Sequence, residues 1–344
     1  MDLIEYISVK PFKSLSSLKD LSNYVNELET HLASQNLNKN LLLSERRLRY
    51  IYAQRNTLYR SFEIAKKSGK KRIIDAPNFQ LKKIQGSLAL ILSSQYELYI
   101  DSIVAHGFRK GKSIISNASP HISKKYVLNV DIKDFFPTIH FGRVKSVLKL
   151  SPYFFQEKMA HIIANLCVKD GKLPQGAPTS PVLTNIICWR LDHNLYNLAK
   201  EKGCEFTRYA DDMTFSSNEN VFNGNFFKEM NKIVKNEGFR FNIPKTRLIF
   251  QSGRQEVTGI IVNEKLNLSR IKINEIRAAL NNWDKKGIDE CQLDFVQKYK
   301  GKPNVDFRDW LWGKLIYLKM VRGEEDLLTI KYMDQYIQLI KRKS

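Results

Sequence analysis

Cysteine is scarce and scattered in this sequence. Its 4 Cys form no CxxC pair and no short Cys/His array; they are Cys167, Cys188, Cys204 and Cys291. This spacing excludes the common zinc-binding patterns and predicts reduced core thiols rather than a disulfide framework. The 6 His are equally scattered. If the protein uses a metal ion, we therefore expect carboxylate ligands, and such hard oxygen ligands suit magnesium.

Long apolar runs are also missing. The most apolar stretches, Leu88 to Leu92 and Ile162 to Val168, are far shorter than the roughly 20 residues that span a bilayer. The N-terminus, with Asp2 and Glu5, lacks the basic and then apolar segments of a secretory signal. We therefore expect a cytoplasmic protein that does not bind membranes.

Acidic residues are few relative to basic ones. The chain has 56 Lys and Arg against 35 Asp and Glu, which gives a formal net charge of +21. This excess favours a polyanionic partner, and nucleic acid fits it once a membrane is set aside. The length of 344 residues with 43% hydrophobic residues allows about two to three structural units with substantial cores.

Apolar periodicity predicts an α+β protein in three segments. Residues 1–68 are expected to form an N-terminal helical layer, with helix-like spacing over 18–28 and 43–59. Residues 69–263 alternate helices, over 81–99 and 185–199, with short strands, over 126–132 and on both sides of a turn within 206–216. Residues 264–344 are basic and mostly helical, with apolar stripes over 276–283, 310–321 and 327–340.

Three acidic residues are candidate metal ligands. Asp211 and Asp212 lie at the turn of the predicted hairpin, and Asp131 ends the predicted buried strand. An Asp-Asp pair alone is usually a solvated turn, and a buried Asp is usually explained by a salt bridge to a nearby Lys. Three carboxylates converging from two strands, however, could hold two divalent ions about 3.5 to 4 Å apart. That arrangement is typical of phosphoryl transfer from a nucleoside triphosphate.

A proline-rich loop at 173–181 is the third element. Its sequence, Leu-Pro-Gln-Gly-Ala-Pro-Thr-Ser-Pro, has little side-chain bulk around Gly176 and leads into a predicted helix. Such a loop lets a base or sugar approach the backbone closely. Taken alone, it is equally well explained as a simple helix-entry loop.

The order Asp131, loop 173–181, Asp211-Asp212 resembles the reverse transcriptase family, with matching segments from about residue 70 to 259. The resemblance implies a right-hand polymerase fold: fingers with residues 1–68 as their helical layer, a fingers and palm catalytic domain over 69–263, and a helical thumb over 264–344. It implies that Asp131, Asp211 and Asp212 are catalytic and, with the backbone oxygen of Ile132, hold two Mg²⁺ ions.

The resemblance also implies deoxynucleotide substrates. The aromatic residue that excludes a 2′-hydroxyl matches Phe136, and the loop that supports the incoming nucleotide and template matches Gln175 and Gly176. Residues alone favour an exposed charge run for the basic turn, whereas the family pattern makes it grip the triphosphate. The basic residues implied to contact substrate phosphates are Lys70, Lys71, Arg72 and Lys245.

Two further motifs are similar to those of retron reverse transcriptases. Asn117-Ala118-Ser119-Pro120-His121, after His106-Gly107-Phe108, resembles NAxxH, and Val257-Thr258-Gly259 resembles VTG. Retron enzymes use a structured noncoding RNA as template and primer, begin at the 2′-hydroxyl of a guanosine, and make branched RNA-linked single-stranded DNA (msDNA). The resemblance implies that product, a role in antiphage defence with an effector protein, and RNA removal by host RNase H.

We expect the basic thumb to recognise the cognate RNA by shape, backbone and 2′-hydroxyl contacts. The resemblance leaves two alternatives open: another bacterial reverse transcriptase (intron-encoded, diversity-generating or abortive-infection type), and an RNA-binding scaffold with a vestigial polymerase site, which the charge alone would explain. The candidate RNA-binding residues are Asn117, His121, Lys298, Lys300, Lys302, Arg308 and Lys314.

Overall fold

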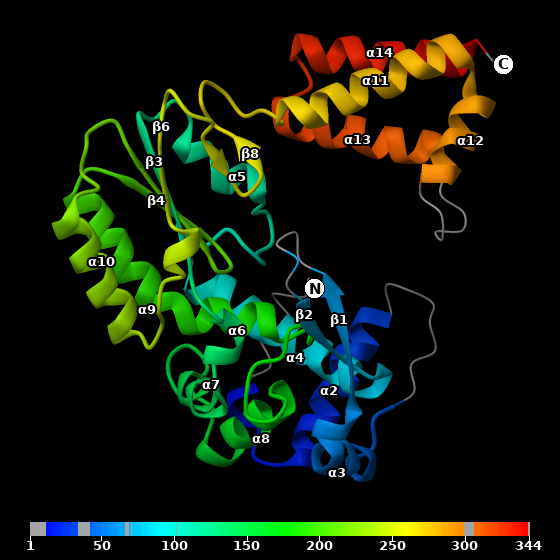
Figure 1. Cartoon of the computed structure of the whole chain (residues 1–344). Helices are drawn as coiled ribbons and strands as arrows, with labels where there is room; N and C mark the ends of the chain where they lie inside the picture. Colours follow the sequence, from blue (N-terminus) through cyan, green and yellow to red (C-terminus); the bar gives the residue numbers. More distant parts are fainter. Residues whose placement is uncertain are drawn as a thin grey trace.

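The computed structural model describes residues 12–33, 42–65, 69, 71–100, 102–298 and 306–342. Its elements mix helices with short antiparallel sheets, so the chain is α+β as predicted. Figure 1 shows the segments in chain order, from the blue N-terminal elements to a yellow and red helical bundle at the opposite end. None of the helices in these described ranges is both long and apolar enough to cross a bilayer.

The N-terminal segment contains helices and a hairpin. Helix α2 (Leu18–Ala33) packs against α3 (Glu45–Gln54) and α4 (Phe79–Tyr99). Strands β1 (Tyr59–Ala65) and β2 (Lys71–Pro77) pair antiparallel. The prediction of a helical layer was therefore wrong over 59–65. This stretch is a strand because it pairs with β2, and the apolar periodicity of a sequence does not reveal such pairing.

The central sheet has the strand order β4-β5-β3-β6, and its paired neighbours are antiparallel. Side chains along a strand alternate between faces. One face, with Phe206, Leu128 and Phe215, is buried in the same hydrophobic cluster as residues of α9 and α10; the other carries Asn129 and Asp131. The bounds are β3 Tyr126–Asp131, β4 Glu205–Tyr209, β5 Asp212–Ser217, β6 Arg247–Phe250, α9 Ser180–Glu201 and α10 Gly224–Asn236.

Between β3 and α9 the chain forms short helices that complete the first core. Helix α7 packs on α8, and both contribute buried apolar residues to the cluster that includes the central sheet. The loop at 173–181 is joined to this core by Leu173, which is buried in it and whose N–H donates to the carbonyl of Ile139 at 2.9 Å. The bounds are α6 Phe135–Thr138, α7 Phe141–Leu148 and α8 Glu157–Cys167.

The C-terminal segment has its own hydrophobic core. Helices α11, α13 and α14 pack on one another, and α12, which periodicity did not predict, packs on α11 and α13. Ala118 of α5 and Val127 of β3 belong to the same cluster and join it to the central sheet. The bounds are α5 Ile114–Ala118, β7 Glu256–Val257, β8 Ile260–Ile261, α11 Arg270–Lys286, α12 Ile288–Lys298, α13 Phe307–Arg322 and α14 Leu327–Lys341.

Leu311→Ala is expected to lower the free energy of unfolding of this C-terminal core by about 2 to 5 kcal/mol, because Leu311 is fully buried and its truncation leaves a cavity. Leu327→Ala is the matched control: Leu327 is 84% exposed, so its truncation should change the free energy by about 0.5 kcal/mol or less. Urea unfolding followed by circular dichroism measures both. Equal shifts of the two variants would contradict the packing of α13.

Candidate active site

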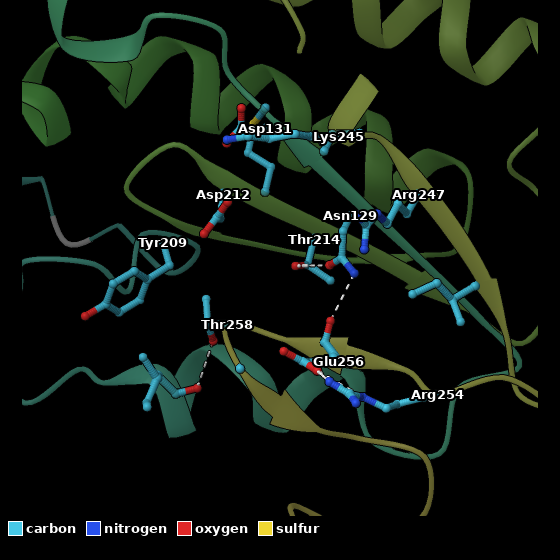
Figure 2. Close-up of a pocket in the computed structure, with 15 residues that line it drawn as sticks. Asn129, Asp131, Tyr209, Asp212, Thr214, Lys245, Arg247, Arg254, Glu256 and Thr258 are labelled. Atoms are coloured by element: carbon cyan, nitrogen blue, oxygen red, sulfur yellow. Dashed lines mark hydrogen bonds and ion pairs between the residues drawn. The ribbon is translucent and has the colours of Figure 1, made fainter. Parts of the chain in front are cut away.

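The register of the central sheet brings two of the predicted acids together. Asp131, the last residue of β3, lies directly opposite Asp212, the first residue of β5. Both point to the same face as Asn129 and Thr214, and Figure 2 shows these side chains along one wall of a pocket. The pocket has a volume of about 730 Å³. Strand β6 extends the wall of the acids, and the other wall comes from β7 and the turn that follows it.

Asp211 lies in the tight turn between β4 and β5. Ala210, just before it, has a φ of 57°, in the left-handed region that non-glycine residues seldom adopt. The backbone N–H of Ile132 donates a hydrogen bond to the carbonyl of Asp211 at 3.1 Å, so the turn is tied to the end of β3. This bond keeps Asp211 next to the end of β3, where Asp131 and Ile132 lie.

Lys245 forms an ion pair with Asp131, one of the candidate metal ligands. Its ammonium lies 2.7 Å from Asp131 Oδ2, and the amide of Asn242 donates to Asp131 Oδ1 at 2.8 Å. The Lys side chain is 60% exposed whereas that of Asp131 is 7% exposed, so the ammonium can leave for solvent or for a phosphate. In the absence of other cations Lys245 therefore neutralises one of the three carboxylates.

The other two acids have raised pKa values. Reduced solvation, with the charges of Asp211 and Asp131, raises the pKa of Asp212 to about 6. Reduced solvation also raises the pKa of Asp211, and Asp131 adds to this effect, while Lys245 and Arg72 oppose it. Like charges at such close range are unfavourable without a counter-ion.

A divalent cation fits this donor set. In the described ranges no group of at least three His, Cys, Asp or Glu side chains is arranged around an ion position, and the Asp131 carboxylate is bound to Lys245. The donors are nevertheless hard carboxylate oxygens from adjacent backbone positions, and the raised pKa values mark negative charge in need of compensation. Asp131, Asp211 and Asp212 are the residues that would hold the cation.

A second pocket, of about 410 Å³, is lined by three of the predicted nucleotide contacts. Lys71, Arg72 and Gln175 line it together with Lys169 and Lys172, two basic residues that the sequence motifs did not indicate. Arg72 also acts on the charge of Asp211, which places its guanidinium within electrostatic range of the acids. Lys70 lies outside the described residues, and Phe136 is half-buried against Phe135.

The loop around Gly176 is bound to the fingers hairpin. The N–H of Asp75 in β2 donates to the carbonyl of Gln175 at 2.7 Å. Gly176 has a φ of 126°, and a Cβ there would lie 2.8 Å from the carbonyl oxygen of Asp75. Close packing against β2 therefore requires glycine at this position, in addition to any approach by a nucleotide.

The prediction of direct RNA contact by the NAxxH residues was wrong for His121. Its side chain is fully buried, and its ring nitrogens lie 2.6 Å from Ser216 Oγ and 2.8 Å from Thr207 Oγ1. Burial lowers the pKa of His121 to about 3, so the ring is neutral. His121 thus ties β4 to β5 from within the protein. Asn117 is 1% exposed and is equally shielded from a large ligand.

The NAxxH and VTG motifs are in contact. The amide of Asn117 donates to Thr258 Oγ1 at 3.4 Å, and this hydroxyl lies 3.5 Å from the carbonyl of Ile114. Thr258 and Gly259 connect β7 to β8 with φ values of 47° and 85°, as a two-residue hairpin turn with two positive φ angles requires. A β-branched residue is strained there, and Thr258 faces the pocket of the acids (Figure 2).

The predicted RNA contacts of the thumb are placed only in part. Lys298 and Arg308 are exposed, whereas Lys314 forms an ion pair with Glu275 at 2.9 Å and lies over the ring of Trp310. Lys300 and Lys302 lie outside the described residues. RNA binding by these residues stays a prediction.

The sequence analysis did not identify several residues of the pocket. Asn129 could have been found from strand alternation, since it lies two residues before Asp131 on the same face. Arg247, Arg254 and Glu256 reach the pocket only because β6 and β7 are brought to it by the fold, and Arg254 pairs with Glu256 (Figure 2). Arg247 lies beside Asn129 in the sheet that carries the acids, whereas Arg254 and Glu256 add charge to the other wall.

The affinity of this site for a divalent cation is expected to fall as the pH drops through about 6. Below that pH Asp212 holds a proton that must leave before a cation binds, and above it the carboxylate is free to bind. Manganese binding followed by electron paramagnetic resonance across this range measures the effect. In Asp212→Asn the binding should be weak and lose this pH dependence; a wild-type affinity that is constant through pH 6 would contradict the assignment.

The raised pKa of Asp212 also makes the stability of the folded protein depend on pH. In the folded protein without bound cations, the pKa of Asp212 lies above its ordinary value of 3.8. The folded state therefore binds this proton more tightly than the unfolded state, and the contribution of Asp212 to stability falls as the pH rises from 3.8 to about 6. Bound cations should reverse this trend.

The chain was compared with known proteins. The family model described as "Reverse transcriptase (RNA-dependent DNA polymerase)" matches residues 64–262. The Retron Mx65 reverse transcriptase of Myxococcus xanthus is 34% identical over 285 residues, which cover 78% of this chain and 62% of that protein. The Retron Ec86 reverse transcriptase of Escherichia coli is 33% identical over 251 residues, which cover 72% of this chain and 76% of that protein.

The match to a third relative extends further along the chain. The Retron Mx162 reverse transcriptase of Myxococcus xanthus is 33% identical over 320 residues, covering 81% of this chain and 64% of that protein. The chain thus spans less than two thirds of the two Myxococcus proteins. Among solved structures, a telomerase from Candida albicans with a fragment of telomeric RNA has a TM-score of 0.48 and 12% identity, covering 92% of this chain and 68% of that chain.

The family match covers more than half of the chain and includes the strand pair, the loop and the turn that hold the candidate acids. The family has a right-hand polymerase fold, and by its terms we call the central sheet the palm, the β1-β2 hairpin the fingers and the bundle of α11 to α14 the thumb. Because the three relatives named above, at 33 to 34% identity, are retron enzymes, the chain belongs to the retron reverse transcriptases.

Proposed function

We propose that this protein is an RNA-directed DNA polymerase that uses a cognate structured noncoding RNA as both template and primer and makes msDNA. One observation carries the proposal: Asp131 and Asp212 lie opposite each other, with Asp211 in the adjoining turn, on the wall of a polar pocket. The relatives named as retron reverse transcriptases support the retron type over other bacterial reverse transcriptases. The intact acid set argues against a vestigial site.

Two Mg²⁺ ions are the proposed cofactors, held by Asp131, Asp211, Asp212 and the backbone oxygen of Ile132. Such ions, when bound, activate the attacking hydroxyl and stabilise the leaving pyrophosphate. The protein's own part is to hold the three carboxylates next to one another, although reduced solvation and their mutual repulsion raise the pKa values of Asp211 and Asp212 until cations bind. Lys245 neutralises Asp131 until a cation arrives, and from its exposed position it can then approach the leaving phosphate.

The second pocket is the proposed site of the deoxynucleoside triphosphate. Lys71 and Arg72 would bind the phosphates, with Lys70 assisting, and Arg72 lies close enough to affect the charge of Asp211. Phe136, half-buried beside Phe135, would exclude a 2′-hydroxyl from the sugar position. Gln175 and Gly176 would support the nucleotide from the loop that is bound to β2.

The wider biology is proposed from the retron relatives. The RNA-linked product would belong to an antiphage defence system with an effector protein, and removal of the RNA template would depend on host RNase H. Location in the cytoplasm stays a prediction. The +21 charge supports a large polyanionic partner, as the cognate RNA and msDNA would be.

Asp211→Asn combined with Asp212→Asn is expected to lower DNA synthesis by more than roughly 100-fold, since even partners that only orient metal ligands are worth 10 to 100-fold. The assay gives purified protein Mg²⁺, deoxynucleotides and the RNA transcribed from the neighbouring locus, without primer. Asp134→Asn is the matched control, because Asp134 is exposed three residues after Asp131 and should leave synthesis intact.

We expect branched, RNA-linked DNA from the wild type and from Asp134→Asn, and none from the double variant. Extension of an added primer without any primer-free product would indicate a reverse transcriptase of another type. Tight RNA binding with no synthesis under either condition would favour the scaffold alternative. Loss of synthesis in Asp134→Asn would instead move the third carboxylate from Asp212 to Asp134.

Replacing residues 264–344 with the corresponding segment of a related retron enzyme is expected to transfer the choice of RNA. The reason is that this segment has its own hydrophobic core and carries the exposed Lys298 and Arg308. Competition between the two cognate RNAs for the chimera measures the preference. A chimera that keeps the original preference would refute recognition by the thumb.

A further inference from the structure

The palm contains a fully buried ion pair that the proposed chemistry does not use. Arg208 of β4 is 0% exposed and Asp192 of α9 is 2% exposed. The guanidinium binds the carboxylate at two points, with Nε at 2.5 Å from Oδ1 and Nη2 at 2.6 Å from Oδ2. Burial by itself lowers the pKa of Arg208, but the Asp192 carboxylate raises it above its usual value. Burial also raises the pKa of Asp192, and the charge of Arg208 opposes this rise.

Stability alone is a poor explanation for this pair. Removing two charges from water is costly, and apolar residues of similar volume in place of a buried pair are often neutral or stabilising. The strand position already faces an apolar layer, since Phe206 and Met213 lie on the same face of the sheet and are buried. An apolar residue at 208 would fit that layer, so the guanidinium needs another reason.

The remaining donors of Arg208 supply one. Nη1 donates to the backbone carbonyl of Ala210 at 3.0 Å, and Nη2 donates to Asn185 Oδ1 at 3.1 Å. The amide of Asn185 in turn donates to the carbonyl of Gly107 at 2.9 Å. A Cβ at Gly107 would lie 2.7 Å from the backbone N of Ala210, so the two segments are in direct contact.

The carbonyl that Arg208 holds is critical for the site. Ala210 has its positive φ of 57° at the turn of the catalytic hairpin. Its carbonyl belongs to the peptide group that links Ala210 to Asp211. A hydrogen bond to this oxygen therefore fixes the orientation of that peptide plane, and with it the direction of the Asp211 side chain. A non-glycine residue in this conformation costs about 1 to 3 kcal/mol and persists only where the surroundings hold it.

We propose that Arg208 is a positioning residue of the polymerase site: its guanidinium, anchored on α9, fixes the carbonyl of Ala210 and thereby the direction of the two carboxylates that follow. The proposal rests on the polymerase function proposed above. It also assigns a role to Asp192, which orients the guanidinium, and to Asn185, which joins Arg208 to Gly107. A lysine cannot replace Arg208, because one ammonium lacks the planar fork that reaches carboxylate and carbonyl together.

The test uses Arg208→Lys and, in case that variant folds poorly, the apolar double variant Arg208→Met with Asp192→Leu. Both are assayed on a poly(rA) template with an oligo(dT) primer, dTTP and a series of Mg²⁺ concentrations, at equal amounts of folded protein. We expect kcat to fall by about 100-fold, as for a misplacement of reacting groups by about 1 Å. The Mg²⁺ concentration for half-maximal rate should rise, while the KM for dTTP stays unchanged because Lys71 and Arg72 are untouched.

Arg322→Lys is the matched control. Arg322 in the thumb binds Asp326 through Nε at 2.7 Å and Nη2 at 3.0 Å, and Asn267 Oδ1 through Nη1 at 2.6 Å, so the same change is made in the same kind of fork. It should lower the melting temperature without altering the Mg²⁺ dependence.

Arg208 variants that match Arg322→Lys in kcat and Mg²⁺ dependence would overturn the positioning role. A purely structural role would show in the melting temperature alone. A wild-type protein that neither extends this primer nor makes DNA from the cognate RNA would overturn the proposed polymerase function instead, so the two failures are distinguishable.

Discussion

The placement of Asp131 opposite Asp212 across the β3-β5 pair is the constraint on which the palm depends. Like charges at facing positions destabilise a sheet, so this register persists only with compensation from the surrounding structure. Lys245 supplies positive charge at 2.7 Å from Asp131, and the N–H of Asn242 donates to the carbonyl of Asp131 at 2.7 Å, which holds the lysine segment in place. Lys245 compensates only part of the repulsion between the acids. The repulsion that remains favours the binding of cations.

The two faces of the palm sheet divide the work. The face toward α9 and α10 is apolar and includes the stacked rings of Phe206 and Phe215, 4.5 Å apart. The opposite face carries the acids, Asn129 and Thr214, and it looks into the pocket. A strand can do both because successive side chains point to opposite sides. Rigid packing on one face therefore holds the chemical groups on the other.

The two motifs typical of retron enzymes act through the interior in this structure. His121 joins β4 to β5, and Asn117 contacts Thr258, so the NAxxH segment connects the catalytic hairpin with the strained VTG turn. Only the turn reaches the pocket. A contribution of these motifs to RNA choice would thus pass through the shape of the pocket wall, and direct contacts would come from exposed residues elsewhere.

The sequence by itself predicted many of the helices and strands and indicated the three candidate acids. Strand β3, the hairpin of β4 and β5, and helices α4, α9, α11, α13 and α14 follow from apolar period and turn residues, which are local signals. The order of Asp131, the loop with Gln175 and the Asp211-Asp212 pair was sufficient to indicate the family, and the matches to retron enzymes confirmed it.

The tertiary structure alone decided which residues share a site. Contacts between distant segments pair residues 59–65 with 71–77 and bury His121. They also bring Lys169 to the second pocket. The ion pair of Arg208 with Asp192 is of the same kind: an Arg before the turn and an Asp within a helix look solvent-exposed in a sequence. Only the packing of α9 on β4 removes both from water and directs the guanidinium to the turn, because burial is a property of the assembled layers.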